Sequence, residues 1–288
     1  MKSLSDSYIY EMSAEKQPAV KARPGETIEV ETLDAFGGQI TSDEDTLEGM
    51  DMDKANPATG PIYVDSAKPG DTLVVRIKDI QVHSPGVQGI VPGFGFLSET
   101  YDDPEVTLHE IKEGNISFSG LQLAQEPMIG TIGVAPETGS VHCHSPGTHG
   151  GNLDTPDIGP NSTLYLPVFH EGALLALGDV HALQGDGEVC GVSIEVGSTT
   201  TIEVDVLEGE ISTPMLENEE EFITLGSGET MEEAGKIALE AMIDYLADHK
   251  GFSKQEAYKF CSIATDMQVS QVVNPLRTIR VSVKKEYL

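Results

Sequence analysis

The sequence predicts a mainly β fold, of the β-sandwich or barrel-like kind, with a smaller C-terminal α/β portion. Residues 1–212 are rich in Gly, Pro, Val, Ile and Thr, and short alternating runs recur there between turn signals. A helical period appears only after residue 213. We therefore expect a β-rich domain over residues 1–212 and an α/β segment over residues 213–288 packed on it.

Three alternating runs are the clearest strands, and they cover residues 27–34, 72–82 and 199–207. The first two follow Pro-Gly pairs and share the pattern P-G-[E/D]-T-[I/L]-x-V-x-x-x-D, beginning at Pro24 and Pro69. This short repeat suggests that one hairpin-like unit is used twice in a sandwich or barrel.

The C-terminal portion contains two predicted helices and a last strand. Residues 230–251 place apolar side chains at helical spacing, with acids in the first turn, bases in the last and a closing glycine. Ser253 and Glu256 have the spacing of a capping box, which predicts a second helix over residues 253–273. Residues 278–288 then read as a strand.

Charge and cysteine content exclude several classes of function. The chain has 48 acidic and 17 basic residues, for a formal charge of -31, which argues against binding to nucleic acid or to an anionic membrane. The first twenty residues lack a signal-like apolar core and no later run is long enough to span a membrane, so we expect a cytoplasmic protein. Cys143, Cys190 and Cys261 are widely separated and should be free thiols.

The segment Gly178–Gly191, GDVHALQGDGEVCG, follows a nearly continuous apolar run that predicts a buried strand. If that strand continues, Asp179 and His181 point to the same face. Glu188 follows the G-D-G turn, and Glu195 lies on the returning strand. A plain hairpin whose acids cap turn amides is the alternative. We favour a functional site, because an ionised carboxylate at the centre of a strand needs a partner or a metal.

A second concentration of polar residues lies between Val141 and Pro160. His142 and His144 would share one face of a strand, with Cys143 on the other. His149, Asn152 and Asp154 follow in a glycine-rich stretch without a secondary-structure pattern, and long irregular loops in compact domains are often functional. A histidine that simply satisfies its hydrogen bonds is the alternative for each imidazole, although His149, beside paired glycines, is the stronger candidate ligand.

Asp34, at the end of the first repeat unit, is a third candidate. Its alternative interpretation is an Asx turn leading into Gly37-Gly38, and Asp79 ends the second unit in the same way. The glycines and aromatics of residues 91–97 suit a pocket wall, although a β-bulge would explain them equally well.

Several motifs of this sequence resemble those of the acetamidase/formamidase family. The resemblance rests on NPATGPIYVDSAKPGDTL, HGGNLD, LYLP, EGAL and above all GDVHALQGDGEVCGVSIE, and it runs from about Asp34 to Glu195. One departure is Leu153, where the family usually has Met. By position, the family's polar motif residues fall here on Asp34, His149, Asn152, Asp154, Asp179, His181, Gln184, Asp186, Glu188 and Glu195.

The resemblance implies hydrolysis of short amides such as formamide or acetamide to a carboxylate and ammonia, in a metal-containing site of the β-rich domain. We hypothesise that Glu188 moves the proton and that His149 with Asn152 binds the carbonyl oxygen, while Gln184 and Asp154 contact the substrate. The predicted metal ligands are Asp34, Asp179, His181 and Glu195.

Zinc suits a ligand set that includes histidine, whereas the surplus of carboxylates would also admit calcium. A homodimer or higher homo-oligomer is expected. Two alternatives stay open at this point. Cys190 could act as a nucleophile in a thiol amidase, although no lysine lies between Lys112 and Lys236 to assist it. The chain could also be a non-catalytic, calcium-binding β-sandwich that holds a small polar ligand, although it has no Trp to stack against a sugar.

Overall fold

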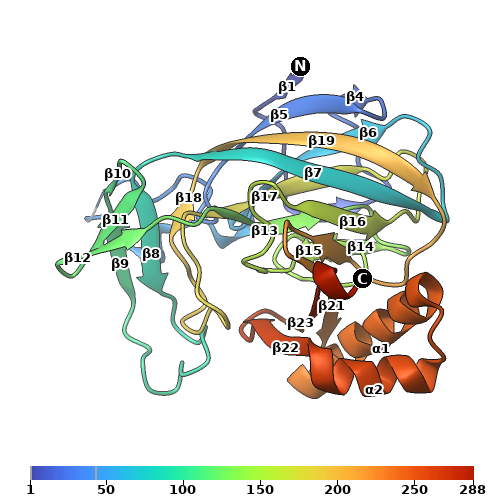
Figure 1. Ribbon diagram of the computed structural model, residues 1–288. Coiled ribbons are helices and arrows are strands. Elements are labelled where there is room, and N and C mark those ends of the chain that lie inside the picture. The colour runs from blue at the N-terminus through green and yellow to red at the C-terminus, as the bar shows by residue number, and fades with distance from the viewer. Residues whose placement is uncertain (1, 43) are drawn as a thin grey trace.

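Two nine-stranded sheets dominate the computed structural model, which describes residues 2–42 and 44–288, and they confirm the predicted mainly β fold (Figure 1). The first sheet has the order β1-β5-β19-β7-β16-β20-β21-β23-β22. The bounds of its strands, in that order, are Lys2–Leu4, Glu26–Thr32, Ser198–Glu208, Asp71–Val82, Thr163–Pro167, Met215–Glu217, Glu221–Gly228, Arg277–Lys284 and Thr265–Gln271.

The second sheet runs β15-β13-β17-β18-β8-β9, and β6 joins it beside β17 with β2 and β4 on its far side. These strands cover Gly150–Asn152, Met128–Gly133, Leu175–His181, Glu195–Val196, Gly86–Ile90, Glu105–His109, Ala58–Val64, Tyr8–Ile9 and Val20–Ala22. Two small sheets complete the β structure. One contains β10 (Ile111–Lys112), β11 (Asn115–Phe118) and β12 (Leu121–Ala124), and the other pairs β3 (Glu11–Ser13) with β14 (Ser140–His142).

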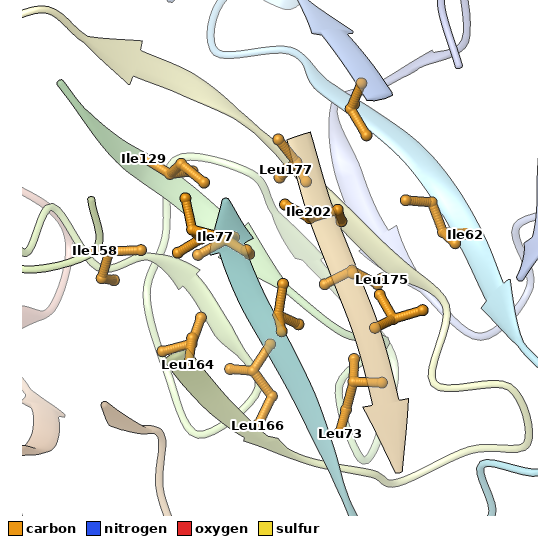
Figure 2. Close-up of a cluster of buried hydrophobic side chains, with 14 of the residues drawn as sticks. Ile62, Leu73, Ile77, Ile129, Ile158, Leu164, Leu166, Leu175, Leu177 and Ile202 are labelled. Atoms are coloured by element: carbon orange, nitrogen blue, oxygen red, sulfur yellow. The ribbon is translucent and has the colours of Figure 1, made fainter. Parts of the chain in front are cut away.

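The main hydrophobic core lies between the two large sheets. Ile77 of β7, Ile202 of β19 and Leu164 of β16 meet Ile129 of β13 and Leu177 of β17 in one buried cluster (Figure 2). β19 alternates buried and partly exposed residues over Ser198–Asp205, as the period-two pattern of the sequence predicts, whereas β13 and β17 are buried at every position. This core fixes β17, whose last residues carry the candidate site.

The two repeat units flank the same strand. β5 and β7 both pair antiparallel with β19, one on each side. The pairing of β7 shifts register between Thr201 and Ile202, and β7 continues to Val82, whereas β5 ends at Thr32. The two corresponding aspartates are therefore not equivalent, because Asp79 lies within a strand and Asp34 lies in a turn beyond one.

The C-terminal helices pack on the end of the first sheet (Figure 1). α1 (Met231–Lys250) ends at Gly251, as predicted, and this glycine has a left-handed conformation. The helix begins after Thr230, whose side chain caps it. α2 (Lys254–Ala264) has the predicted capping box. In the part of the chain that the structure describes, neither helix combines the length and apolarity needed to cross a membrane.

The predicted extent of the second helix is wrong. Helix α2 stops at Ala264, and residues 265–271 form β22 instead of continuing the helix to residue 273. Thr265 donates a hydrogen bond to the Cys261 carbonyl, 2.8 Å away, and the residues after it pair antiparallel with β23. The long-range pairing with β23, which local periodicity does not reveal, overrides the helical pattern.

The last predicted strand is shorter than expected, because β23 covers Arg277–Lys284 and a 3-10 turn follows over Lys285–Tyr287. The expected boundary near residue 213 falls between β19 and β20, where the first sheet continues without a break through the pairing of β16 with β20. The division into two domains stays a prediction.

Candidate active site

Three of the predicted ligands meet where β17 and β18 pair. Asp179 and His181 end β17, and the strand register places His181 directly opposite Glu195 of β18. His181 Nε2 lies 3.4 Å from Asp179 Oδ1 and 3.1 Å from Glu195 Oε2. All three side chains are buried. The strand continuation and the returning strand predicted from the sequence thus bring these groups together.

Two further buried carboxyl groups approach the same imidazole from loops. Asp154 Oδ1 lies 4.0 Å from His181 Nε2. Glu188 follows the G-D-G turn, and its Oε1 accepts a hydrogen bond from Ser193 Oγ at 3.1 Å. One ligand-type atom from each of Asp154, His181 and Glu188 lies within 4.8 Å of the others. We call the five residues Asp154, Asp179, His181, Glu188 and Glu195 the acidic cluster.

Hydrogen bonds from outside the cluster orient its members. Gln184 Oε1 lies 2.9 Å from His181 Nδ1, and Gln184 Nε2 donates to the Asp154 carbonyl at 2.8 Å. An amide oxygen can only accept, so Nδ1 carries a proton and Nε2 is the nitrogen turned toward the carboxylates. Asn56 Nδ2 donates to Asp179 Oδ2 at 3.3 Å. Thr131 Oγ1 also lies 3.3 Å from Asp179 Oδ2, but its single proton goes to the closer Asn152 Oδ1.

The backbone is strained at this site. Asn56, Asp154, Asp179 and Glu188 all have positive φ, between 42° and 54°. This left-handed conformation is uncommon outside glycine, and such residues gather where a fold holds a functional geometry. Gly130 provides the space for it, because a Cβ there would lie 2.5 Å from Asp154 Oδ1 and 2.9 Å from Asp179 Oδ2.

Burial and mutual charge set the protonation of the cluster. Burial alone would lower the pKa of His181, but the Glu195 and Asp179 carboxylates outweigh it and raise that pKa well above its ordinary value. Burial likewise opposes ionisation of Asp179, yet the imidazolium and its hydrogen bond leave the Asp179 pKa lowered. One ion pair, between His181 and Asp179, therefore anchors the cluster.

The other three carboxyl groups hold protons more tightly than usual. Burial raises the pKa of Asp154 and of Glu195 to about 7 in each case, and the charge of Asp179 adds to the effect. Burial, followed by the charge of Asp154, raises the pKa of Glu188 well above its ordinary value. Buried carboxyl groups with raised pKa values are suited to taking up and returning a proton.

A cavity of about 610 Å³ opens above the cluster. Its floor is polar and includes Asn56, Asn152, Asp179, Glu188, Glu195 and Asn274. Six apolar side chains also line the cavity, and we call them the apolar wall: Phe36, Leu47, Met50, Val91, Phe94 and Val192. The pocket-wall interpretation of residues 91–97 is thus supported by the positions of Val91 and Phe94.

Asn152 and His149 differ in their access to this cavity. Asn152 lies on the floor, and its Oδ1 accepts a hydrogen bond from Thr131 Oγ1 at 2.5 Å, which leaves its amide nitrogen as the donor. The predicted irregular loop here contains the short strand β15, which ends at Asn152. His149 is buried outside the cavity lining, and its Nε2 has no hydrogen-bond partner among the described residues. Burial lowers its pKa to about 4.

Asp34 lies outside both groups of metal-ligand atoms found among residues 2–42 and 44–288. Its Oδ1 accepts a hydrogen bond from the Gly38 amide at 2.9 Å, which matches the Asx-turn alternative. The next two residues, Ala35 and Phe36, line the cavity. Burial, with a contribution from the charge of Asp179, raises the pKa of Asp34. Its role as a metal ligand stays a prediction.

Three polar residues that the sequence did not single out complete the site. Asn274, between β22 and β23, donates to Asp154 Oδ2 at 2.5 Å from a position 120 residues away. Asn56 and Thr131 contact Asp179, as described above. Asn56 lies in one of the quoted family motifs, which was an available signal. Asn274 and Thr131 have no local pattern that could have identified them.

The His142–His144 pair and Cys190 lie in different surroundings. The rings of His142 and His144 contact each other through their Nδ1 atoms and line the cavity, while Cys143 is buried. Cys190 Sγ donates a hydrogen bond to the Val192 carbonyl at 3.0 Å and is absent from the cavity lining. The contacts described for this thiol include no histidine or carboxylate that could activate it.

The acidic cluster has the features expected of a divalent-cation site. Asp154 Oδ1 and Glu195 Oε2 are buried and accept no well-aligned hydrogen bond from the described residues, although His181 Nε2 lies 3.1 Å from Glu195 Oε2. Such carboxylate oxygens are stable when a cation or proton is present. Both groups of ligand-type atoms contain His181. His181 Nε2 has a single lone pair, so it can bind one ion.

Carboxylates and an imidazole are the ligand types that hold the metal ion in metal-dependent hydrolases, and here they line or adjoin an open cavity. A model of the acetamidase/formamidase family matches residues 14–144 and 137–281. The chain therefore belongs to the acetamidase/formamidase family, as its motifs suggested.

Individual relatives agree with this assignment. The chain is 29% identical over 251 residues to a putative formamidase of Schizosaccharomyces pombe, covering 65% of this chain and 61% of the relative. It is 28% identical to an acetamidase of Mycolicibacterium smegmatis, covering 68% and 64%. The chain thus spans about three fifths of the length of these curated relatives.

Solved structures match over nearly the whole chain. An acetamidase from Bacillus halodurans has a TM-score of 0.97 at 41% identity and covers 99% of this chain and 98% of its own. A predicted acetamidase/formamidase from Thermoanaerobacter tengcongensis also has a TM-score of 0.97, at 43% identity, with coverage of 100% and 96%. A gamma lactamase from Delftia acidovorans, at 23% identity and a TM-score of 0.70, shares the fold.

Proposed function

We propose that this protein hydrolyses amides of the type R–CO–NH2 to the carboxylate and ammonia, with one divalent cation in the acidic cluster. Family membership supports the amide substrate. The observation that carries the proposal is the gathering of buried carboxylate oxygens around His181 Nε2, among which Asp154 Oδ1 and Glu195 Oε2 accept no well-aligned hydrogen bond. When bound, the cation would acidify a water molecule and polarise the amide carbonyl.

We propose Asp179, His181 and Glu195 as the principal ligands, with Asp34 retained as a predicted fourth. Zinc is favoured because an imidazole nitrogen is present and its other nitrogen is fixed by Gln184, the arrangement that metal-ligating histidines commonly have. Calcium prefers six or more oxygen ligands and is the second candidate, because the carboxylates are abundant.

Glu188 is proposed to carry the proton. Its pKa is raised, and its side chain lines the floor of the cavity. Both features suit Glu188 to accept a proton from the attacking water. The water oxygen bonds to the carbonyl carbon, Glu188 returns the proton to the nitrogen, and the C–N bond breaks to release ammonia. Asn152 donates its amide N–H to the carbonyl oxygen, which takes on negative charge during the attack.

Two earlier predictions have less support at this site. His149 lies outside the cavity lining, so Asn152 is the favoured donor to the carbonyl oxygen. Gln184 is hydrogen-bonded to the His181 ring and to the Asp154 carbonyl, so we assign it the positioning of these residues and not contact with the substrate. Asp154 is itself part of the acidic cluster. The thiol mechanism has less support as well, because Cys190 contacts a carbonyl and no base among the described residues. Assembly into a homodimer or larger homo-oligomer stays a prediction.

The test combines elemental analysis with ammonia release from formamide, acetamide and propionamide. We expect about one equivalent of a divalent metal, loss of turnover after prolonged chelation and recovery when zinc is added back. Cys190→Ala should retain turnover within about twofold, whereas a thiol nucleophile would lose nearly all of it. Turnover that survives chelation would contradict the metal proposal. A metal-containing protein that releases no ammonia from any amide would favour the non-catalytic binding alternative.

A further inference from the structure

The cavity above the acidic cluster is much larger than a short amide. Its volume is about 610 Å³, within the range of sites that hold ligands of drug size. Acetamide has only four non-hydrogen atoms and fills roughly the volume of two or three water molecules, about 60–90 Å³. A short amide would leave most of this cavity to water.

The surplus space is lined by apolar side chains that the fold holds in place. Five of the six residues of the apolar wall, all except Phe94, belong to one hydrophobic cluster with Ile40 and Val87. Phe36 and Val192 are buried in this cluster, whereas Leu47 and Met50 are only partly buried. These residues are distant in sequence but pack together in one cluster. The wall is therefore a packed surface, and it faces the cavity.

The polar and apolar sides of the cavity orient a substrate. Glu188, Asn152 and Asn274 line the polar floor, where the amide nitrogen must lie to receive its proton from Glu188. An alkyl group on that nitrogen would meet carboxyl and amide groups and desolvate them. A group attached to the acyl carbon can extend to the apolar wall, where burial of hydrocarbon is favourable.

We infer that the preferred substrates are primary amides with an apolar acyl group of several carbons. This inference rests on the proposed amide hydrolysis and assigns its substrate class. It follows from the juxtaposition of a polar floor and a packed apolar wall in one cavity of this size.

The first test is a homologous series from acetamide to octanamide, with kcat/KM measured by ammonia release from the metal-loaded protein. Burial of one methylene is worth about 0.8 kcal/mol, or about fourfold, so each added carbon should raise kcat/KM about two- to fourfold until the wall is covered. We expect hexanamide to exceed acetamide at least tenfold. Equal values along the series, or a decline beyond propionamide, would overturn the inference.

The second test separates the acyl side from the nitrogen side with an isomeric pair. Hexanamide and N-butylacetamide have the same atoms and nearly the same hydrophobicity, but the alkyl chain is on opposite sides of the scissile bond. Hydrolysis of N-butylacetamide is followed by the release of butylamine. Hexanamide should be favoured at least tenfold, and equal values for the two isomers would refute the assignment of the acyl side.

Met50→Gln keeps the length of a wall side chain and makes its end polar. It should lower the ratio of kcat/KM for hexanamide to that for acetamide at least threefold. The matched control is Met231→Gln at the exposed start of α1, outside the cavity lining, which should leave that ratio unchanged. An unchanged ratio in Met50→Gln would count against the wall, and thermal unfolding of both variants verifies that they are folded.

The outcomes distinguish this inference from the proposed function. Turnover of acetamide without a gain for longer acyl chains would refute only the substrate class. Failure of the metal-loaded protein to hydrolyse any amide would refute both.

Discussion

Two buried clusters of charge lie on either side of the loop 182–194, one around His181 and one around Arg280. Arg280 of β23 is almost fully buried, and its Nη2 contacts both carboxylate oxygens of Asp186, at 2.8 and 3.0 Å. Its Nε lies 2.9 Å from Asp157 Oδ2, and its Nη1 donates to the Val269 carbonyl. One guanidinium thus serves two carboxylates, of which Asp186 is half exposed to solvent.

The clusters differ in the number of buried carboxyl groups that share one cation. His181 is the single cationic group among four carboxyl groups, each less than 8% exposed, and two carboxylate oxygens there accept no well-aligned hydrogen bond from the described residues. The Arg280 cluster joins the motif loop to the C-terminal sheet and has two carboxylates for its one cation, of which only Asp157 is largely removed from solvent. Asp157 Oδ2 also lacks a well-aligned hydrogen bond, although Arg280 Nε lies 2.9 Å away. The comparison teaches that a shortage of buried positive charge, more than burial or motif position, distinguishes the site that we propose to hold a cation. Asp186 belongs to the family motif but acts here in packing.

Exchanging the cation of each cluster for glutamine should separate the two roles most strongly. His181→Gln removes the proposed nitrogen ligand, so we expect loss of bound metal and a fall in kcat/KM of about a thousandfold or more. Arg280→Gln leaves Asp157 without its cation and should reduce the free energy of unfolding by about 3 kcal/mol. Its metal content should be unchanged and its kcat/KM should fall less than about tenfold.

Elemental analysis, ammonia release and denaturant unfolding of both variants check this pair of expectations. Arg280→Lys keeps the positive charge but lacks the planar guanidinium that contacts both carboxylates. It should recover part of the free energy of unfolding that Arg280→Gln loses. If Arg280→Gln lost its metal while His181→Gln kept it, the assignment of the two clusters would be reversed.

A methyl group at Gly130 should disturb only the acidic cluster. In Gly130→Ala the new Cβ would lie within 3 Å of Asp154 Oδ1, the Asp179 carbonyl and Asp179 Oδ2, so these groups must move. We expect metal affinity to fall about 10- to 100-fold and kcat/KM about 100-fold. Gly49→Ala, where a Cβ meets nothing within 4 Å, is the matched control. Titration with zinc after chelation measures the metal affinity. Equal affinities for Gly130→Ala and Gly49→Ala would show that displacing the Asp154 and Asp179 carboxylates does not weaken metal binding.

Local patterns were sufficient to predict the centre of the cluster. Asp179 and His181 share a face because side chains alternate along a strand, and Glu195 lies opposite because the next strand returns beside the first. The closing Gly251 of α1 and the capping box of Ser253 and Glu256 in α2 are local signals of the same kind. These features depend on residues close in sequence, so local sequence patterns can predict them.

The remainder depends on contacts between distant segments. Asn274 reaches Asp154 only because β22 pairs with β23 and the first sheet extends through the C-terminal portion. The same pairing ends α2 at Ala264, which helical periodicity could not predict. The placement of His149 outside the cavity is also a packing result, since its glycine-rich surroundings suggest exposure to a ligand equally well.

The smallest effect, a change in thermal stability with pH, follows from the protons that the cluster holds. Burial raises the pKa of Asp154 and Glu195 to about 7, whereas the unfolded chain releases these protons near pH 4. Between those values the folded, metal-free protein binds more protons, so their contribution to stability falls as pH rises from about 4 to 7. The raised pKa of His181 acts in the same direction at higher pH, because its stabilising proton is lost as pH rises through that pKa.

A bound cation replaces these protons, so its affinity should increase with pH. We therefore expect the difference in Tm between zinc-loaded and chelated protein to widen by several degrees from pH 5 to pH 8. Using the difference cancels the titration of the many surface carboxylates, which both forms share. His181→Gln should show almost no difference at either pH, because its site lacks the nitrogen ligand. A gap that stayed constant or narrowed with rising pH would mean that zinc does not displace these protons, and that the surplus of buried carboxylates is balanced by protonation alone.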